Sequence, residues 1–351
     1  MERIQTLLAE RELDALLVTD LVNVRWLTGF PSSNAVVVVL PDRMVLLTDF
    51  RYVAGARRAV RRAEVAEGKR DLVDDAVALL PARARVGFED QVMTVAARAR
   101  WGDAAGEGRE LVGLGGDVER LRAVKDPGEL AAIQAAVALA DDTLLAVLER
   151  GLVGKRESEV AALLQYEMRV RGAQRDSFPP IVASGDRSDS PHSTPTDAVI
   201  ERDTLVLIDF GAELDGFCSD GTRTFATGDA DDEMREVYEL VLRAQRAGLE
   251  AVRAGVTGRE ADAAARAIIE AAGHGAHFGH GLGHGVGMKI HEEPRLTQRS
   301  DQVLERGHVV SVEPGVYLEG RFGVRIEDLV AVTDDGIVNM SSSSKDLIVV
   351  D

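Results

Sequence analysis

The chain has 351 residues, and its 41 lysines and arginines against 59 aspartates and glutamates give a formal net charge of −18. A hydrophobic share of 45% and a charged share of 28% are typical of a soluble globular protein, and the acidic balance argues against nucleic acid or an anionic membrane as partner. The single cysteine excludes an internal disulfide, and the N-terminus lacks the pattern of a signal peptide, so we expect a cytoplasmic protein.

The first 120 residues alternate helical and strand patterns, which predicts an α/β domain. Two apolar runs flank the turn residues Pro41-Asp42 and predict a β-hairpin. In chain order, we expect a helix at 4–12, a strand at 15–19, hairpin strands at 34–40 and 44–48, helices at 49–62 and 72–80, and a strand at 85–87.

Charge changes along the chain. Residues 1–120 carry 17 basic and 19 acidic side chains, whereas residues 121–351 carry 24 and 40. The change coincides with a glycine-rich stretch at 113–117, and Asp126-Pro127 just beyond it is typical of a helix start. We therefore expect two domains, one over 1–120 and one over 121–351.

The second domain contains a repeated pattern. Arg156-Glu157-Ser-Glu159-Val-Ala161 resembles Arg259-Glu260-Ala-Asp262-Ala-Ala264 at an offset of 103 residues. Each motif follows a helical stretch (127–150 or 231–254) and precedes two strands, at 205–210 and 216–227 in the first copy and at 309–314 and 323–333 in the second. This pattern predicts an α+β domain with an internal duplication, in which the strands of both copies share one sheet and the helices lie outside.

Each predicted pair of strands carries two carboxylates. Asp209 lies in an apolar strand, and Asp220 lies on the return strand after an Asp-Gly turn. Glu313 and Glu327 occupy the corresponding places in the second copy, where strand alternation puts Arg325 on the same face as Glu327. Carboxylates so close would repel one another, so they must find arginine partners or solvent, or bind divalent cations.

Five of the seven histidines lie between residues 274 and 291, interleaved with glycines. The glycines lack the GxGxxG spacing of a dinucleotide-binding loop, and His291-Glu-Glu-Pro lacks the HExxH spacing of a zinc-peptidase helix. Glycines instead let the backbone pass close to a ligand while histidines point inward. Four carboxylates and one imidazole form a hard, oxygen-rich set, which favours two Mn²⁺ or Co²⁺ ions over a thiolate zinc site.

Together these motifs resemble those of the pita-bread metallopeptidases, specifically the Xaa-Pro peptidases (prolidase and aminopeptidase P). They are Ile208-Asp-Phe-Gly, Ser219-Asp-Gly-Thr-Arg-Thr-Phe, His280-Gly-Leu-Gly-His-Gly-Val-Gly, Val312-Glu-Pro-Gly and Val324-Arg-Ile-Glu-Asp. The resemblance covers nearly the whole chain and implies a creatinase-like N-terminal domain before the duplicated catalytic domain. It also implies two divalent metal ions, manganese first and cobalt or zinc as alternatives, with the ligands Asp209, Asp220, His284, Glu313 and Glu327, of which Asp220 and Glu327 would bridge the ions.

The resemblance further implies roles for residues around the metals. His192 would contact substrate near the scissile bond, and His280 and His291 would hold the proline side and stabilise the tetrahedral intermediate. Glu313 would also shuttle a proton from the bridging water, and Arg325 would orient the ligands.

Two residues bear on the substrate. Arg295 matches the position where dipeptide-cleaving members hold the substrate carboxylate, for which a guanidinium fork is suited; a solvated surface arginine is the alternative. Phe178 would line the proline pocket, or else pack in the core.

We therefore predict a metal-dependent Xaa-Pro dipeptidase that acts on proline-containing peptides. An Xaa-Pro aminopeptidase acting on longer peptides is the alternative. The N-terminal 110 or so residues argue against a methionine aminopeptidase-like enzyme. The complete ligand set argues against a creatinase-like enzyme or a non-catalytic pita-bread binding protein. The family resemblance also implies a homodimer.

Overall fold

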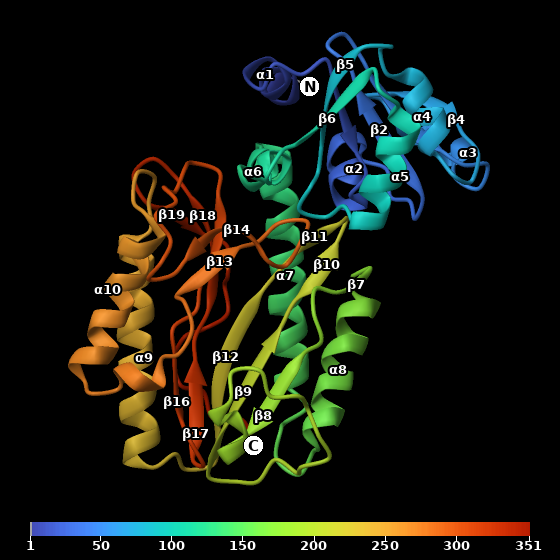
Figure 1. Ribbon diagram of the computed structural model, residues 1–351. Coiled ribbons are helices and arrows are strands. Elements are labelled where there is room, and N and C mark those ends of the chain that lie inside the picture. Colours follow the sequence, from blue (N-terminus) through green and yellow to red (C-terminus); the bar gives the residue numbers. More distant parts are fainter. Residues whose placement is uncertain (1) are drawn as a thin grey trace. The chain divides into compact units, whose positions relative to one another are not determined.

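The computed structural model describes residues 2–351, which form two compact units that divide between Arg122 and Ala123 (Figure 1). Each unit has hydrophobic clusters of its own. The predicted site residues all fall in the second unit.

The first unit is built on a six-stranded mixed sheet with the order β4-β3-β2-β1-β5-β6. Alternate residues of its apolar strands enter two separate hydrophobic clusters, so both faces of the sheet are buried. The strands are β1 (Ala15–Val18), β2 (Ala35–Val39), β3 (Met44–Thr48), β4 (Glu64–Glu67), β5 (Ala84–Phe88) and β6 (Arg109–Gly113). The helices are α1 (Glu2–Glu10), α2 (Leu21–Thr28), α3 (Val53–Ala59), α4 (Val73–Leu79), α5 (Val95–Ala105) and α6 (Asp117–Ala123).

Most elements expected in this unit are present. The hairpin predicted around Pro41-Asp42 is confirmed as β2 and β3. The helix predicted over 49–62 begins only at Val53, because the Asp49 carboxylate accepts hydrogen bonds from the backbone and guanidinium of Arg51 and holds this segment in a turn. Helices α2, α5 and α6 and the short edge strands β4 and β6 were not predicted.

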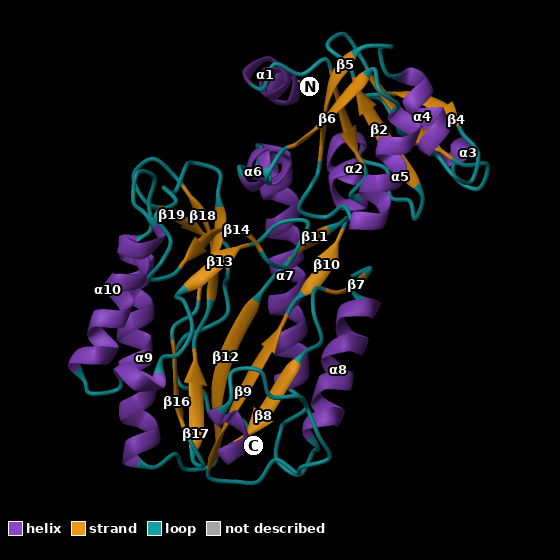
Figure 2. Cartoon of the chain, in the orientation of Figure 1, coloured by secondary structure: helices purple, strands orange, loops and turns teal. Residues whose placement is uncertain are grey.

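The second unit places its strands between two pairs of helices, α7 with α8 and α9 with α10 (Figure 2). One hydrophobic cluster joins α7 and α8 to β9, and another joins α9 and α10 to the strands of the second copy. The helices are α7 (Pro127–Leu148), α8 (Glu157–Val170), α9 (Asp232–Ala251) and α10 (Gly258–Ala271). The strands are β7 (Arg175–Asp176), β8 (Ile181–Ser184), β9 (Thr204–Phe210), β10 (Ala212–Leu214), β11 (Phe217–Cys218), β12 (Gly221–Thr227), β13 (Gly283–Gly285), β14 (Glu292–Leu296), β15 (Val309–Val312), β16 (Gly315–Leu318), β17 (Phe322–Arg325), β18 (Asp328–Val332) and β19 (Ile337–Asn339).

The duplication is present, but two of its details differ from expectation. Glu159 and Glu260 cap the backbone N–H groups that start α8 and α10, so these helices correspond at an offset of 101 residues rather than 103. The strands of the copies do not share one sheet: β12-β9-β8, β14-β13-β15-β18-β19 and β16-β17 are separate. A backbone hydrogen bond from Glu327 N–H to the Thr222 carbonyl (3.1 Å) links the two copies.

The separation arises because both return strands are interrupted. The strand predicted at 216–227 breaks between β11 and β12, and the one predicted at 323–333 breaks between β17 and β18. The breaks contain Asp220 and Glu327, two of the predicted ligands. Gly211 permits the first break, since a Cβ at this residue would lie 2.0 Å from the Ser219 carbonyl oxygen.

Helix α7 is, within the described part of the chain, the one helix long and apolar enough to cross a membrane by length and composition. Leu139, Leu144 and Val147 on this helix pack into the same cluster as Val206 and Ile208 of β9. The structure thus gives its apolar face a role in the protein core.

Candidate active site

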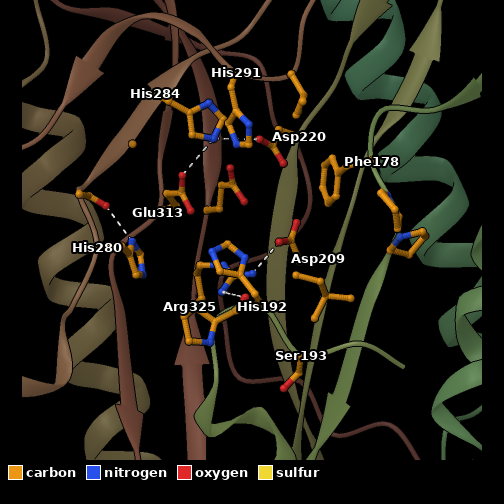
Figure 3. Close-up of a pocket in the computed structure, with 18 of the residues that line it drawn as sticks. Phe178, His192, Ser193, Asp209, Asp220, His280, His284, His291, Glu313 and Arg325 are labelled. Carbon is orange, nitrogen blue, oxygen red and sulfur yellow. Dashed lines mark hydrogen bonds and ion pairs between the residues drawn. The ribbon is translucent and has the colours of Figure 1, made fainter. Parts of the chain in front are cut away.

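A cavity of about 480 Å³ opens into the second unit, between the strands of the two copies (Figure 3). Every residue predicted for the site lines it: Phe178, His192, Asp209, Asp220, His280, His284, His291, Arg295, Glu313, Arg325 and Glu327. Folding therefore brings together side chains from the four strands β9, β13, β14 and β17 and from the loops between strands.

Three carboxylates form the floor of the cavity. Asp209 lies on β9 opposite Thr222 of β12, and Asp220 immediately precedes β12. Glu327 follows β17, and one carboxylate oxygen from each of the three lies within 4.8 Å of the others. All three are buried, with at most 9% of their surface exposed.

The electrostatics of this floor fit a bound cation. Burial raises the pKa of Asp209, Asp220 and Glu327, and the negative charge of neighbouring carboxylates raises it further for Asp220 and Glu327. Asp209 Oδ1 and Glu327 Oε1 are buried and have no hydrogen-bond partner among the described residues. Buried carboxylate oxygens left free in this way are suited to divalent cations.

His284 and Glu313 extend the carboxylate cluster. The His284 Nε2 atom lies 3.3 Å from Glu313 Oε1 and 3.5 Å from Asp220 Oδ2. Burial lowers the pKa of His284 to about 3, which keeps the imidazole neutral. Its Nδ1 lies 3.1 Å from the Gly285 carbonyl oxygen, which can only accept a hydrogen bond, so Nδ1 carries the proton. The Nε2 lone pair therefore points toward the carboxylates, as a metal ligand requires.

Two residues hold the floor in place. The Arg325 Nη2 atom donates to Asp209 Oδ2 at 2.6 Å, and its Nε donates to the Thr222 hydroxyl at 2.9 Å. The same hydroxyl donates to Glu327 Oε2 at 2.7 Å. Arg325 and Thr222 thus fix one oxygen of Asp209 and one of Glu327 and leave the other oxygen of each free.

A tyrosine connects Arg325 to His280. The Arg325 Nη1 atom donates to the Tyr317 hydroxyl at 2.7 Å, and this hydroxyl lies 3.0 Å from His280 Nε2. His280 Nδ1 faces the Gly281 carbonyl oxygen at 2.8 Å, so Nδ1 is the protonated nitrogen and Nε2 accepts the tyrosine proton. Both nitrogens of His280 are therefore engaged, and the ring is fixed as part of the cavity wall.

The outer part of the cavity is both apolar and basic. Phe178 and Ile290 supply apolar walls, and His192 and His291 lie beside the carboxylates (Figure 3). The rings of His291 and His284 meet edge to face, with centroids 4.4 Å apart. Arg295 on β14 lies opposite His284 on β13 in the antiparallel strand register, and the Arg295 side chain remains 42% exposed.

Three polar residues that contact the predicted site residues were not predicted from the sequence. Thr222 and Tyr317 make the contacts described above, and the Ser311 hydroxyl donates to Glu313 Oε1 at 3.0 Å. Ser311 could have been predicted from the sequence, because a polar residue two positions before Glu313 on an apolar strand lies on the same face as Glu313.

Comparison with known proteins places the chain in a family. Residues 131–334 match the model of metallopeptidase family M24, and residues 1–124 match that of the creatinase/prolidase N-terminal domain. The chain therefore belongs to metallopeptidase family M24. The predictions of the family, of the creatinase-like and pita-bread folds and of a metal-dependent peptidase are confirmed.

Individual relatives span nearly the whole chain. An uncharacterised peptidase of Bacillus subtilis is 40% identical over 99% of both sequences. The structure of an Xaa-Pro dipeptidase from Bacillus anthracis is similar with a TM-score of 0.94 and 38% identity, covering 99% of this chain and 98% of that one. An X-Pro aminopeptidase from Thermotoga maritima is similar with a TM-score of 0.91 and 35% identity, covering 97% and 99%.

Proposed function

We propose that this protein is an Xaa-Pro dipeptidase, which hydrolyses the imide bond before a C-terminal proline. The observation that carries the proposal is that one cavity holds both the buried carboxylate cluster and the Arg295 guanidinium. The cluster is suited to metal-assisted hydrolysis, and the guanidinium is suited to the free carboxylate of a dipeptide. The name of the Bacillus anthracis relative supports the same substrate class.

We propose that Asp209, Asp220, His284, Glu313 and Glu327 hold two divalent ions, manganese first and cobalt or zinc as alternatives. When bound, such ions make water a nucleophile near neutral pH and polarise the substrate carbonyl.

Side chains of the protein would transfer protons and contact the substrate during that reaction. Burial raises the pKa of Glu313 to about 7 in the metal-free protein. We propose that in the metal-loaded protein its carboxylate takes up the proton of the attacking water. His192 and His291 lie where their ring nitrogens can contact the scissile peptide unit, and Arg325 holds Asp209 in place.

The substrate's chemistry matches the outer cavity. An imide bond before proline has no N–H to donate, so recognition must come from ring packing and from the peptide's ends. Phe178 and Ile290 would pack on the proline ring, with the fixed ring of His280 completing the wall. Arg295 would bind the proline carboxylate through its guanidinium fork.

An aminopeptidase acting on longer Xaa-Pro peptides is the second candidate. The similarity to the Thermotoga maritima aminopeptidase favours it. The exposure of Arg295 also leaves room for chain beyond proline.

One assay separates these candidates. Metal-stripped protein is supplied with Mn²⁺, Co²⁺ or Zn²⁺ and offered Leu-Pro and the longer Leu-Pro-Ala-Ala. We expect faster cleavage of Leu-Pro. We also expect that Arg295→Met raises the KM for Leu-Pro about tenfold or more, since it removes a charge-assisted contact, whereas Arg299→Met, an exposed arginine outside the cavity, does not. Cleavage of only the longer peptide refutes the dipeptidase proposal, and no cleavage with any metal refutes both candidates.

We further propose a cytoplasmic homodimer. Size-exclusion chromatography with light scattering tests the dimer, and a mass equal to one chain of 37.7 kDa contradicts it.

A further inference from the structure

Two histidines of the cavity wall, His192 and His280, lie on loops rather than on strands. A loop has no ladder of backbone hydrogen bonds to fix its conformation, so other contacts must hold the backbone that carries these histidines. In both cases a fully buried carboxylate in the first two turns of a helix binds backbone groups of the loop, and neither carboxylate lines the cavity.

Glu157, the first residue of α8, holds the His192 loop at both ends. Its Oε1 accepts the backbone N–H of Ser184 (2.9 Å) and the Ser184 hydroxyl (3.2 Å). Its Oε2 accepts the backbone N–H of Thr196 (3.1 Å) and the Thr196 hydroxyl (2.9 Å). Ser184 and Thr196 bracket the segment that carries His192, so a single carboxylate closes this loop.

Arg187 continues the clamp inside the loop. Its Nε lies 2.9 Å from Glu157 Oε2, and its Nη2 donates to the Thr194 carbonyl at 2.8 Å. The Arg187 carbonyl in turn accepts the Ser193 hydroxyl at 2.5 Å. These contacts fix the backbone on the C-terminal side of His192.

The second copy uses a similar clamp around His280. The carboxylate of Asp262, on α10, is bound by Arg266 at 2.7 and 2.9 Å and accepts the backbone N–H of Leu282 at 3.0 Å. Arg266 also donates to the carbonyls of Phe278 (2.9 Å) and His280 itself (2.6 Å). Glu157 and Asp262 stand at different positions of their helices, the first and the fifth, so the resemblance lies in the contacts.

We propose that Glu157 is a positioning residue, which fixes His192 against the substrate by closing the loop between Ser184 and Thr196, and that Asp262 does the same for His280. The inference deepens the proposed function and rests on it. Burying a charged pair costs more than packing apolar side chains of the same size, so such a pair is weak evidence of a purely stabilising role. Each clamp instead binds backbone groups of the loop that carries a cavity histidine.

A double-mutant cycle between Glu157 and His192 tests the proposal. In Glu157→Gln, the side-chain amide can no longer accept hydrogen bonds at both of its ends. We expect kcat/KM for Leu-Pro to fall about 10- to 100-fold through misplacement of His192, with Mn²⁺ affinity unchanged. In a His192→Ala background the same substitution should change kcat/KM less than twofold, because there is no histidine left to position.

Glu167→Gln is the matched control. Glu167 is also a buried carboxylate of α8 bound by arginines, Arg150 and Arg171, and it lies outside the cavity lining. The Glu167→Gln substitution should lower the midpoint of thermal unfolding without changing kcat/KM for Leu-Pro. The proposal is overturned if Glu157→Gln lowers kcat/KM equally in both backgrounds, or if Glu167→Gln reproduces its kinetic effect.

Limited proteolysis tests the loop independently of activity. With Glu157→Gln, trypsin should cut after Arg187 at least tenfold faster than in wild type or Glu167→Gln, and an unchanged rate overturns the proposal. This readout stands even if wild type cleaves no Xaa-Pro peptide, which would refute the proposed function alone. If Glu157→Gln does not fold, Thr196→Ala takes its place. This substitution removes the hydrogen bond from the exposed Thr196 hydroxyl to Glu157, and the rate of trypsin cleavage after Arg187 is again compared with that of wild type and Glu167→Gln.

Discussion

Removing one charge from the cavity floor should stabilise the metal-free protein while abolishing metal binding. In Asp220→Asn, one of three carboxylates within 4.8 Å becomes neutral without a change in size. At that separation and an effective dielectric constant of about 20, two unit charges repel by about 3 kcal/mol. Because the raised pKa values let the cluster take up protons and relieve part of this repulsion, we expect a gain of about 1 to 2 kcal/mol in the free energy of unfolding at pH 7.5.

The gain should depend on pH with a defined sign. A carboxyl whose folded pKa is raised contributes stability below its ordinary pKa near 4, and this stability is lost as pH rises through the folded value. The advantage of Asp220→Asn should therefore be small near pH 4 and grow toward pH 8. Mn²⁺ at 100 times its Kd should add about 2.7 kcal/mol to wild type and little to the variant.

Urea unfolding followed by circular dichroism, with EDTA or with Mn²⁺, measures both effects. Asp328→Asn is the matched control: burial opposes ionisation of Asp328, but Arg223 and Lys345 hold its pKa below the ordinary value. Losing that carboxylate should therefore lower the unfolding free energy. The reasoning is refuted if metal-free Asp220→Asn is destabilised like Asp328→Asn, or if Mn²⁺ stabilises Asp220→Asn as much as wild type.

Two further substitutions test groups around the site. Thr222→Val removes the hydroxyl between Arg325 and Glu327, so we expect the free energy of unfolding to fall by about 1 to 3 kcal/mol. Calorimetry should also show about 10- to 100-fold weaker Mn²⁺ binding, and an unchanged Mn²⁺ affinity would contradict this expectation. His308 has its pKa lowered to about 4 by burial and then by Lys125, so this residue should contribute a loss of about 3 kcal/mol to wild type as pH falls from about 6.5 to 4. His308→Gln should flatten this part of the pH–stability curve, and an unaltered slope would show that other groups cause the loss.

Local patterns in the sequence predicted much of the fold. The hairpin of β2 and β3 and the long helices α7 and α9 follow from apolar periodicity and turn residues, which act over a few neighbours. Strand breaks and sheet boundaries were mispredicted, because the break before β12 depends on the close approach of Gly211 to Ser219 across a turn. Periodicity within one strand carries no information about such a contact.

Sequence motifs, together with the family resemblance that they carry, were enough to name the predicted site residues without coordinates. All of them line one cavity. The four carboxylates on apolar strands and the histidines among glycines are conspicuous in the sequence itself, whereas His192, Arg295 and Phe178 were named only through the resemblance. The tertiary structure decided their states: which oxygens of Asp209 and Glu327 remain free, and which nitrogen of His284 carries the proton. It also revealed Thr222 and Glu157, whose roles depend on partners far along the chain. Hydrogen bonds and pKa values depend on distance in space and on burial, and only the folded chain sets these.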